Sequence, residues 1–303
     1  KSSAASDVYK RQLISGSLYK DKKLKKPCNV VVVGGGTAGL EAACTAAEVG
    51  CATVLIEKSG ELGGLARRVG KMPNKQRLGY FPQYLERRAM KLKNLFICKN
   101  TEASIEFIEG FKPDIVVNAT GSVPLLPNIP GLKENLEAGN VSTIFDLVDH
   151  VDSYPEDLSG KKVVVIGGGN VAIDVARTST RVGDYNVSMF CLEDRANMPA
   201  SEEEIEEAVE EGVKLDCGWG PKEILTENGK VTGIVLKRCT SVKDADGRFN
   251  PQYDENDTKT VKCSHVFLSI GQTTIWGDLL KGTKVEIDLS LIHISEPTRR
   301  SYI

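Results

Sequence analysis

The sequence lacks several features that mark particular classes of protein. No apolar run approaches the ~20 residues that span a bilayer, so we expect no membrane partner. The 39 Lys and Arg residues balance 41 Asp and Glu residues, which leaves no basic surface to follow a nucleic-acid backbone. The three histidines stand apart from one another and from other metal-ligating or catalytic residue types. We therefore expect neither a nucleic-acid partner nor a metal site.

Cysteines are present, but they are never close together. No two of the eight lie within three residues of each other, which excludes a CxxC redox pair, a zinc ribbon or an iron–sulfur run within this chain. Scattered cysteines in an ordinary α/β composition are typical of the reducing cytosol. The sequence thus predicts a cytoplasmic protein in which several cysteines are small buried hydrophobes.

The length of 303 residues suggests about two domains at ~150 residues each, and 41% hydrophobic residues suffice for a core. Residues 1–24 and 289–303 do not fit this pattern. They resemble translated sequencing-adapter read-through, so we expect them to be non-native or linker tails on an internal fragment of a longer protein. The alternative is a natural variable terminus.

One unit is written twice. Residues 30–36 (VVVVGGG) recur as residues 163–169 (VVVIGGG). Continuous apolar runs of this kind are typical of parallel strands that are buried on both faces. Each run leads into a helical stretch, over residues 37–49 and from 170 to about 180.

The first copy carries the G-x-G-x-x-G spacing at Gly34, Gly36 and Gly39. The first glycine allows a tight turn, the second lets the backbone approach a pyrophosphate, and the third lets the helix pack closely on the strand. The helix that begins at Thr37 and Ala38 would present free N–H groups and its positive dipole end to the phosphates.

The second copy places Gly167, Gly169 and Ala172 at the same three positions, and alanine is accepted at the third. Asn170 and Val171 begin the following helix. The sequence therefore predicts two dinucleotide sites. The alternative is two glycine-rich turns in an ordinary α/β domain.

An acid follows the second strand of each copy. Glu57 comes after residues 51–56, at the distance from Gly39 expected for a group that binds ribose hydroxyls, and Glu193 comes after residues 187–192. Two sites imply two nucleotides, of which the natural pair is a flavin that stays bound and a nicotinamide that exchanges. The glycines alone do not decide which copy binds which nucleotide.

Further motifs resemble a known family. Residues 57–64 (EKSGELGG) resemble the flavin signature E-K-x-x-x-L-G-G of the two-dinucleotide-binding flavoproteins, the pyridine nucleotide-disulphide oxidoreductase-like family. Residues 114–121 (DIVVNATG) resemble the strand that leaves its first domain. Residues 123–131 resemble its proline-rich hinge, and residues 266–272 its returning strand.

The resemblance implies an α/β fold of two Rossmann-like domains, with the second inserted in the first. Each would be a parallel sheet with helices and an antiparallel excursion. FAD would bind residues 25–128 and NAD(P) residues 129–268, and residues 269–288 would return to a truncated FAD domain. A hairpin turn at Asn228 and Gly229 indicates an excursion over about residues 214–263.

The resemblance also implies roles for single residues. FAD would contact the first glycine loop, the acid and the two later motifs: Gly34, Gly36, Thr37, Ala38, Gly39, Glu57, Lys58, Gly63, Gly64, Ala119, Thr120 and Gly121. The nicotinamide nucleotide would contact the second copy: Gly167, Gly169, Asn170, Val171, Ala172, Glu193 and Arg195. Gly271 is also expected at a cofactor. Hydride transfer between the cofactors needs no acid or base, so we expect no catalytic side chain.

The second site departs from the family's NADPH-binding pattern. Relatives of the glutamate synthase type carry two arginines where residues 191–195 read CLEDR. Glu193 would accept from a ribose 2′-hydroxyl and repel a 2′-phosphate, so NADH is favoured over NADPH, although Arg195 leaves NADPH open. The family's final Gly-Asp motif has no counterpart here, so we expect this chain to bind FAD weakly or not at all by itself.

The two halves point to different subfamilies. Residues 63–88 resemble the reductase portion of old yellow enzyme-type 2,4-dienoyl-CoA and 2-enoate reductases, whereas residues 167–177 and 198–200 resemble the glutamate synthase small subunit. The implied function is an FAD-dependent NAD(P)H oxidoreductase module. It would pass hydride to FAD and electrons onward to an electron-accepting domain or subunit, whose FMN and 4Fe-4S centre would lie in a missing upstream part. The alternatives are a glutamate synthase small-subunit-like reductase, a non-catalytic redox sensor and an inactive fragment.

Two further segments favour plain structural interpretations. Residues 202–211 are rich in acids, and Ser201 with Glu204 predicts a capping box at the start of a solvated amphipathic helix, rather than an acidic binding face. Residues 244–247 (DADG) lack the remaining spacing of a calcium loop and predict a hairpin tip.

Overall fold

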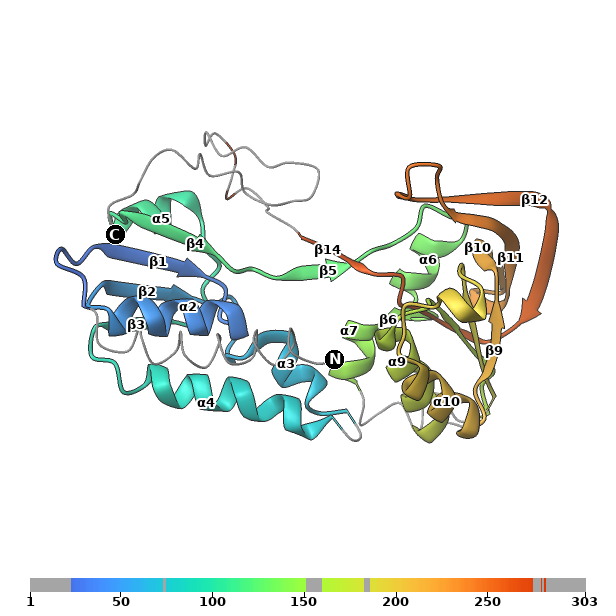
Figure 1. Cartoon of the computed structure of the whole chain (residues 1–303), viewed down its shortest axis with the longest axis horizontal. Helices are drawn as coiled ribbons and strands as arrows, with labels where there is room; N and C mark the ends of the chain where they lie inside the picture. Colours follow the sequence, from blue (N-terminus) through green and yellow to red (C-terminus); the bar gives the residue numbers. More distant parts are fainter. Residues whose placement is uncertain are drawn as a thin grey trace, which may run out of the picture. The chain divides into compact units, whose positions relative to one another are not determined.

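The computed structural model describes residues 23–72, 75–150, 160–182, 186–274, 279 and 281. The chain divides into two compact units, of which the first comprises residues 1–122 and 274–303 and the second residues 123–273. The second unit therefore interrupts the first in sequence (Figure 1). The expected tails lie outside the described residues except for Lys23 and Leu24, and Leu24 donates its N–H to the carbonyl oxygen of Val49 at 2.8 Å.

The first unit contains a four-stranded parallel sheet in the order β3-β2-β1-β4. Its strands are β1 (Asn29–Val33), β2 (Ala52–Ile56), β3 (Leu95–Cys98) and β4 (Ile115–Asn118). The valine run forms the inner strand β1, where four consecutive β-branched side chains are buried. Because strand side chains alternate, Val30 and Val32 pack in one hydrophobic cluster and Val31 and Val33 in another.

Helices complete both clusters of the first unit. They are α2 (Thr37–Glu48), α3 (Gly64–Val69), η1 (Gln76–Gly79), α4 (Tyr80–Ala89) and α5 (Ile105–Gly110). Leu40 and Ala43 of α2 share a cluster with Leu85 and Ala89 of α4, whereas Ile108 of α5 joins the cluster on the opposite face of β1. The sheet is thereby covered on both faces, as a buried parallel strand requires.

The second unit contains a five-stranded parallel sheet in the order β6-β13-β7-β8-β9. Its strands are β6 (Val141–Thr143), β7 (Val163–Ile166), β8 (Val187–Cys191), β9 (Lys214–Cys217) and β13 (His265–Leu268). Its helical elements are α6 (Leu132–Glu137), α7 (Ile144–Asp149), α9 (Asn170–Val182), η2 (Arg195–Asn197) and α10 (Glu202–Glu210). The second VVV run thus repeats the placement of the first, as an inner strand followed by a glycine loop and a helix.

An antiparallel sheet is inserted between β9 and β13. It consists of β10 (Trp219–Glu227), β11 (Lys230–Lys243) and β12 (Phe249–Lys262). Asn228 and Gly229 connect the first two strands with φ of 54° and 73°, and this pair of positive values is what a two-residue hairpin turn of type I′ requires. Residues 244–247 form the next hairpin tip, as predicted, with Asp244 Oδ1 accepting from two backbone N–H groups.

The predicted start of this excursion, at residue 214, is wrong. Residues 214–217 form β9, which pairs in parallel with β8. The physical reason is the helix α10 that precedes it, because a strand–helix–strand crossover returns the chain parallel to the strand it left.

The structure confirms the predicted fold class. Both units contain a parallel sheet with helices, and the second adds an antiparallel sheet. The antiparallel excursion expected in the first unit is not found among its described residues, whose strands form the parallel sheet apart from Ser122 and Thr274 at its boundary. Strands β5 (Ser122–Pro124) and β14 (Gln272–Thr274) pair with each other where the chain leaves and re-enters the first unit.

Candidate functional site

The first glycine loop connects β1 to α2 at the carboxyl end of the strand. Gly34 has φ of +104°, and a Cβ built on it would lie 2.3 Å from the carbonyl oxygen of Ala119. A Cβ on Gly39 would lie 1.8 Å from the carbonyl oxygen of Gly34. Packing therefore requires glycine at the first and third positions of the motif, where the sequence predicted a tight turn and close packing of the helix on the strand.

The second position of the motif is different, because no described atom lies within 4 Å of a Cβ built on Gly36. Gly36 is the N-cap of α2, and no side chain of the described residues caps that helix. The first turn, which contains the predicted contacts Thr37 and Ala38, holds no acid. The N–H groups of this turn therefore suit an anion supplied by a ligand.

Glu57 lies at the end of β2 and reaches the glycine loop. Its Oε2 accepts from the backbone N–H of Gly35 at 2.6 Å, and its Oε1 accepts from that of Ser59 at 2.7 Å. The two bonds fix the carboxylate, and each oxygen still has a lone pair for a ribose hydroxyl. Lys58, the next residue, is exposed and makes no hydrogen bond to another residue that the structure describes.

The second glycine pair closes on the first loop. The N–H of Gly63 donates to the carbonyl oxygen of Gly35 at 2.8 Å, and Gly36 and Gly63 form an isolated parallel bridge. Gly64 has φ of +53°, and a Cβ on it would lie 2.9 Å from the Cα of Gly36. The structure thus brings the two predicted motifs of the first unit together at one edge of its sheet.

Two buried donors at this edge were missed by the sequence reasoning. Arg67 Nε and Asn118 Nδ2 have no acceptor among the residues that the structure describes. Arg67 is three residues beyond Gly64, and its Nε lies 3.2 Å from the position of a Cβ built on Gly63. Asn118 ends β4, beside Val33. A large ligand rich in acceptors, such as a flavin dinucleotide, fits such an edge.

The remaining predicted contacts of the first unit follow β4. Ala119 donates its N–H to the carbonyl oxygen of Val33 at 2.8 Å, which places it beside the glycine loop. Thr120 and Gly121 are exposed, and Gly121 has φ of +83°. Gly271 lies two residues beyond Ser269, and its carbonyl oxygen accepts from the N–H of Leu125 at 3.0 Å.

The second glycine loop repeats the first. Gly167 has φ of +147°, and a Cβ on it would lie 2.2 Å from the carbonyl oxygen of Ser269. No described atom lies within 4 Å of a Cβ on Gly169. Ala172 is fully buried and donates its N–H to the carbonyl oxygen of Gly169 at 2.9 Å, whereas Val171 is exposed. The second loop therefore offers the same open backbone at its middle motif position.

The two acids occupy equivalent places. A Cβ built on Gly168 would lie 2.6 Å from Oε2 of Glu193, and one on Gly35 would lie 3.0 Å from Oε2 of Glu57. In both units, the carboxylate after the second strand therefore lies against the glycine that precedes the open motif position, Gly35 in the first unit and Gly168 in the second. This is the position from which a ribose beside the loop would be bound.

Arg195 lies two residues beyond Glu193 but is already bound within the protein. Its Nη1 and Nη2 donate to the two carboxylate oxygens of Glu202 at 2.9 and 2.5 Å. This contact raises the pKa of the Arg195 guanidinium and lowers that of the Glu202 carboxyl. Asp194 caps η2 by accepting from the N–H of Asn197 at 3.0 Å.

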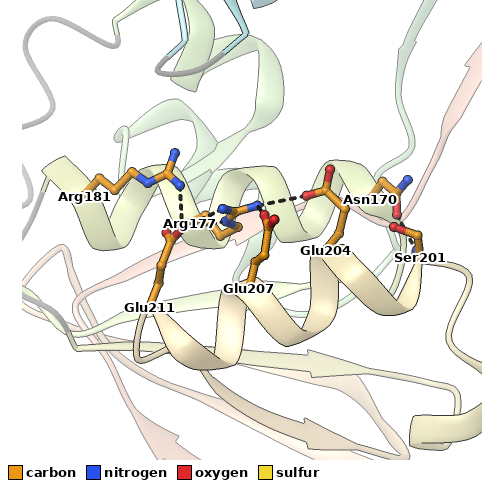
Figure 2. Close-up of polar contacts among 7 residues, drawn as sticks. All are labelled: Asn170, Arg177, Arg181, Ser201, Glu204, Glu207 and Glu211. Carbon is orange, nitrogen blue, oxygen red and sulfur yellow. Dashed lines mark hydrogen bonds and ion pairs between the residues drawn. The ribbon is translucent and has the colours of Figure 1, made fainter.

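Helix α10 is anchored to the second loop at its N-terminus. The N–H of Ala200 donates to the carbonyl oxygen of Gly168 at 3.1 Å, and that of Ser201 donates to Oδ1 of Asn170 at 2.8 Å. Asn170, predicted as a nucleotide contact, thus also links the start of α9 to the start of α10 (Figure 2).

The acidic face of α10 pairs with α9. Arg177 contacts Glu204, Glu207 and Glu211 at 3.1, 2.5 and 2.6 Å, and Arg181 also contacts Glu211 (Figure 2). The predicted capping box is wrong, because the Ser201 side chain makes no cap bond. The Arg177 guanidinium offers Glu204 a charged donor, which outcompetes a neutral backbone N–H.

Comparison with known proteins agrees with this geometry. The sequence model of the pyridine nucleotide-disulphide oxidoreductases matches residues 95–290, and that of the FAD dependent oxidoreductases matches residues 29–87. The chain belongs to the pyridine nucleotide-disulphide oxidoreductase family.

The curated relatives are longer proteins. The NADH oxidase of Thermoanaerobacter brockii is 30% identical over 88% of this chain and 37% of its own length. The glutamate synthase [NADPH] small chain of Azospirillum brasilense is 30% identical over 83% of this chain and 57% of its own length. A solved 2-naphthoyl-CoA reductase is 23% identical over 84% of this chain and 34% of its own, with a TM-score of 0.64, and shares the fold.

The described residues form no disulfide, metal site or membrane-spanning helix. All eight cysteines are described, and none forms a disulfide. The sulfur atoms of Cys28 and Cys51 lie 3.5 Å apart. The two residues precede β1 and β2, so they lie at the sheet edge opposite the glycine loop. The described residues contain no group of metal-ligating side chains. Nor do they include any helix of sufficient length and apolar character to cross a bilayer.

Proposed function

We propose that the first unit holds FAD, that the second holds NADH, and that the reducing equivalents pass onward to an iron–sulfur or FMN partner domain. The observation that supports this proposal most is the repeated loop. Each copy has an open middle glycine, Gly36 or Gly169, and a carboxylate against the loop, Glu57 or Glu193. The EKSGELGG motif, which adds Gly63 and Gly64 to the first loop alone, supports FAD there.

The chain's own residues bind and orient the nucleotides. The uncapped N-terminus of α2 would bind the FAD pyrophosphate, and Glu57 would bind the adenosine ribose. Arg67 and Asn118 would donate the hydrogen bonds that they lack within the protein. When bound, FAD supplies the capacity to accept a hydride and release single electrons. No side chain of the chain needs to transfer a proton in that exchange.

The proposed choice of NADH over NADPH rests on Glu193. Its carboxylate lies against Gly168, where it would accept hydrogen bonds from the ribose hydroxyls. A 2′-phosphate at the same place would put two negative groups in contact, which is unfavourable by several-fold in binding even in a solvated site.

Anaerobic titration of the FAD-reconstituted chain with NADH tests this function. We expect the visible absorbance of oxidised flavin to fall in proportion to added NADH. A chain that binds FAD but is reduced by neither NADH nor NADPH would contradict the enzyme proposal and support a redox sensor. A chain that binds neither nucleotide would support the inactive-fragment alternative.

A second candidate is a reductase of the glutamate synthase small-chain type. The 30% identity to the Azospirillum brasilense small chain favours it, as does the resemblance of residues 198–200 and the following acidic helix. The uninterrupted gene distinguishes the two candidates. An upstream β/α barrel supports the old yellow enzyme type, and a neighbouring gene for a glutamate synthase large subunit supports the alternative.

A further inference from the structure

Arg195 is the single cation between β8 and α10, in a segment that also carries Glu193 and Asp194 and that is followed by Glu202. An arginine at this end of the second strand is the group that binds the 2′-phosphate in NADP-specific Rossmann folds. In this chain, both terminal nitrogens of the guanidinium are bound to Glu202 instead. The two guanidinium nitrogens that could bind two phosphate oxygens are therefore occupied by the two oxygens of a carboxylate.

Both partners of this pair are held in place by their backbones. Asp194 caps η2, the short helix that begins with Arg195. Glu202 is the first residue of α10, directly after Ala200 and Ser201, whose N–H groups bind Gly168 and Asn170.

The far part of α10 is fixed as well, since Arg177 on α9 binds Glu204, Glu207 and Glu211 (Figure 2). The glycine loop and the carboxylate that binds Arg195 are thus parts of one connected arrangement. The backbone contacts of α10 therefore hold the Glu202 carboxylate beside the Arg195 guanidinium.

We propose that Glu202 is a specificity-determining residue of the nicotinamide site, because it withholds Arg195 from a 2′-phosphate. This inference rests on the proposed binding of a nicotinamide nucleotide to the second unit. Glu193 repels the phosphate directly, and Glu202 removes the group that would attract it. NADH has no 2′-phosphate for Arg195 to bind, so we expect the Arg195–Glu202 pair to disfavour only NADPH.

Two small ligands test this inference without any redox step. 5′-AMP and 2′,5′-ADP differ only by the 2′-phosphate, and their dissociation constants can be measured by calorimetry on the full chain. We expect Glu202→Ala to strengthen 2′,5′-ADP binding relative to 5′-AMP by about fivefold. In the Arg195→Ala background, the same substitution should change the ratio by less than about twofold.

Glu203→Ala is the matched control. Glu203 lies in the same first turn, is exposed, and makes no ion pair with another described residue. The substitution therefore removes the same charge as Glu202→Ala but does not release Arg195. The Arg195–Glu202 pair is 41% and 66% exposed, and exposed ion pairs contribute little to folding, so both variants should keep the wild-type melting temperature. Glu202→Gln provides a second, nearly isosteric variant.

Two results would overturn the inference alone. One is an unchanged affinity ratio in both Glu202 variants. The other is an equal change in Glu203→Ala, which would show a general effect of charge. If the wild-type chain binds neither 5′-AMP nor NADH, the proposed nucleotide site itself is wrong and the inference falls with it.

Discussion

Glu57 and Gly35 are joined by a hydrogen bond of 2.6 Å, from the backbone N–H of the glycine to the carboxylate Oε2. The bond connects the end of β2 to the loop after β1, so the acid and the glycine motif form one structure before any ligand arrives. In the second unit, Oε2 of Glu193 lies 2.6 Å from the position of a Cβ built on Gly168.

Replacing Glu57 with glutamine should weaken FAD binding. The amide oxygen is a poorer acceptor than a carboxylate, and the amide nitrogen cannot accept from Gly35 or Ser59. We expect Glu57→Gln to raise the dissociation constant for FAD about tenfold, measured by quenching of flavin fluorescence. The control is Glu61→Gln, an exposed residue of the same loop, which should leave the constant unchanged. Equal effects of the two substitutions would show that the Gly35 contact plays no part.

Replacing Arg177 with methionine should destabilise the second unit. The Arg177 side chain is only 14% exposed and is bound by three glutamates, which would be left facing one another. We expect a loss of about 1–3 kcal/mol in the free energy of unfolding, measured by denaturant titration. Arg248→Met is the control, because that side chain is 81% exposed and should change stability by less than about 0.5 kcal/mol.

The same ion-pair cluster predicts a dependence of stability on pH. Burial raises the pKa of the Glu211 carboxyl, but hydrogen bonds from Arg177 and Arg181 outweigh burial and lower it overall. A group whose folded pKa is depressed contributes stability above its unfolded pKa of about 4.3 and loses it as the pH falls further. The stability difference between wild type and Glu211→Gln should therefore be full at pH 7 and shrink below about pH 4. A difference that stays constant down to pH 3 would contradict this assignment.

The fold could be predicted where the chain requires one local arrangement. Four valines followed by three glycines allow little besides a buried strand and a tight turn, and the structure places Val30–Val33 and Gly34 accordingly. Asn228 and Gly229 likewise predicted their own turn. The assignment of FAD and NADH to the two units, and of single residues to each nucleotide, stays a prediction.

Features that depend on distant partners could not be predicted in this way. Ser201 and Glu204 have the spacing of a capping box, but nothing in that local pattern shows that Arg177, 27 residues before Glu204, takes the carboxylate instead. The donors of Arg67 and Asn118 stand out only once burial is known. Their one sequence signal is proximity to two motifs, the Gly63–Gly64 pair for Arg67 and residues 114–121 for Asn118.

Substitution of one middle glycine at a time tests the central claim, that two similar loops hold two different nucleotides. An alanine Cβ meets no described atom at Gly36 or at Gly169, so neither Gly36→Ala nor Gly169→Ala should disturb the folded chain; Gly110→Ala, equally open, is the control. Binding of FAD and of NADH is measured on each variant by calorimetry. The account predicts that Gly36→Ala weakens FAD alone and Gly169→Ala weakens NADH alone, each at least about tenfold. Two results would contradict the claim. One is that a single substitution weakens binding of both nucleotides, and the other is that neither substitution weakens binding of either nucleotide.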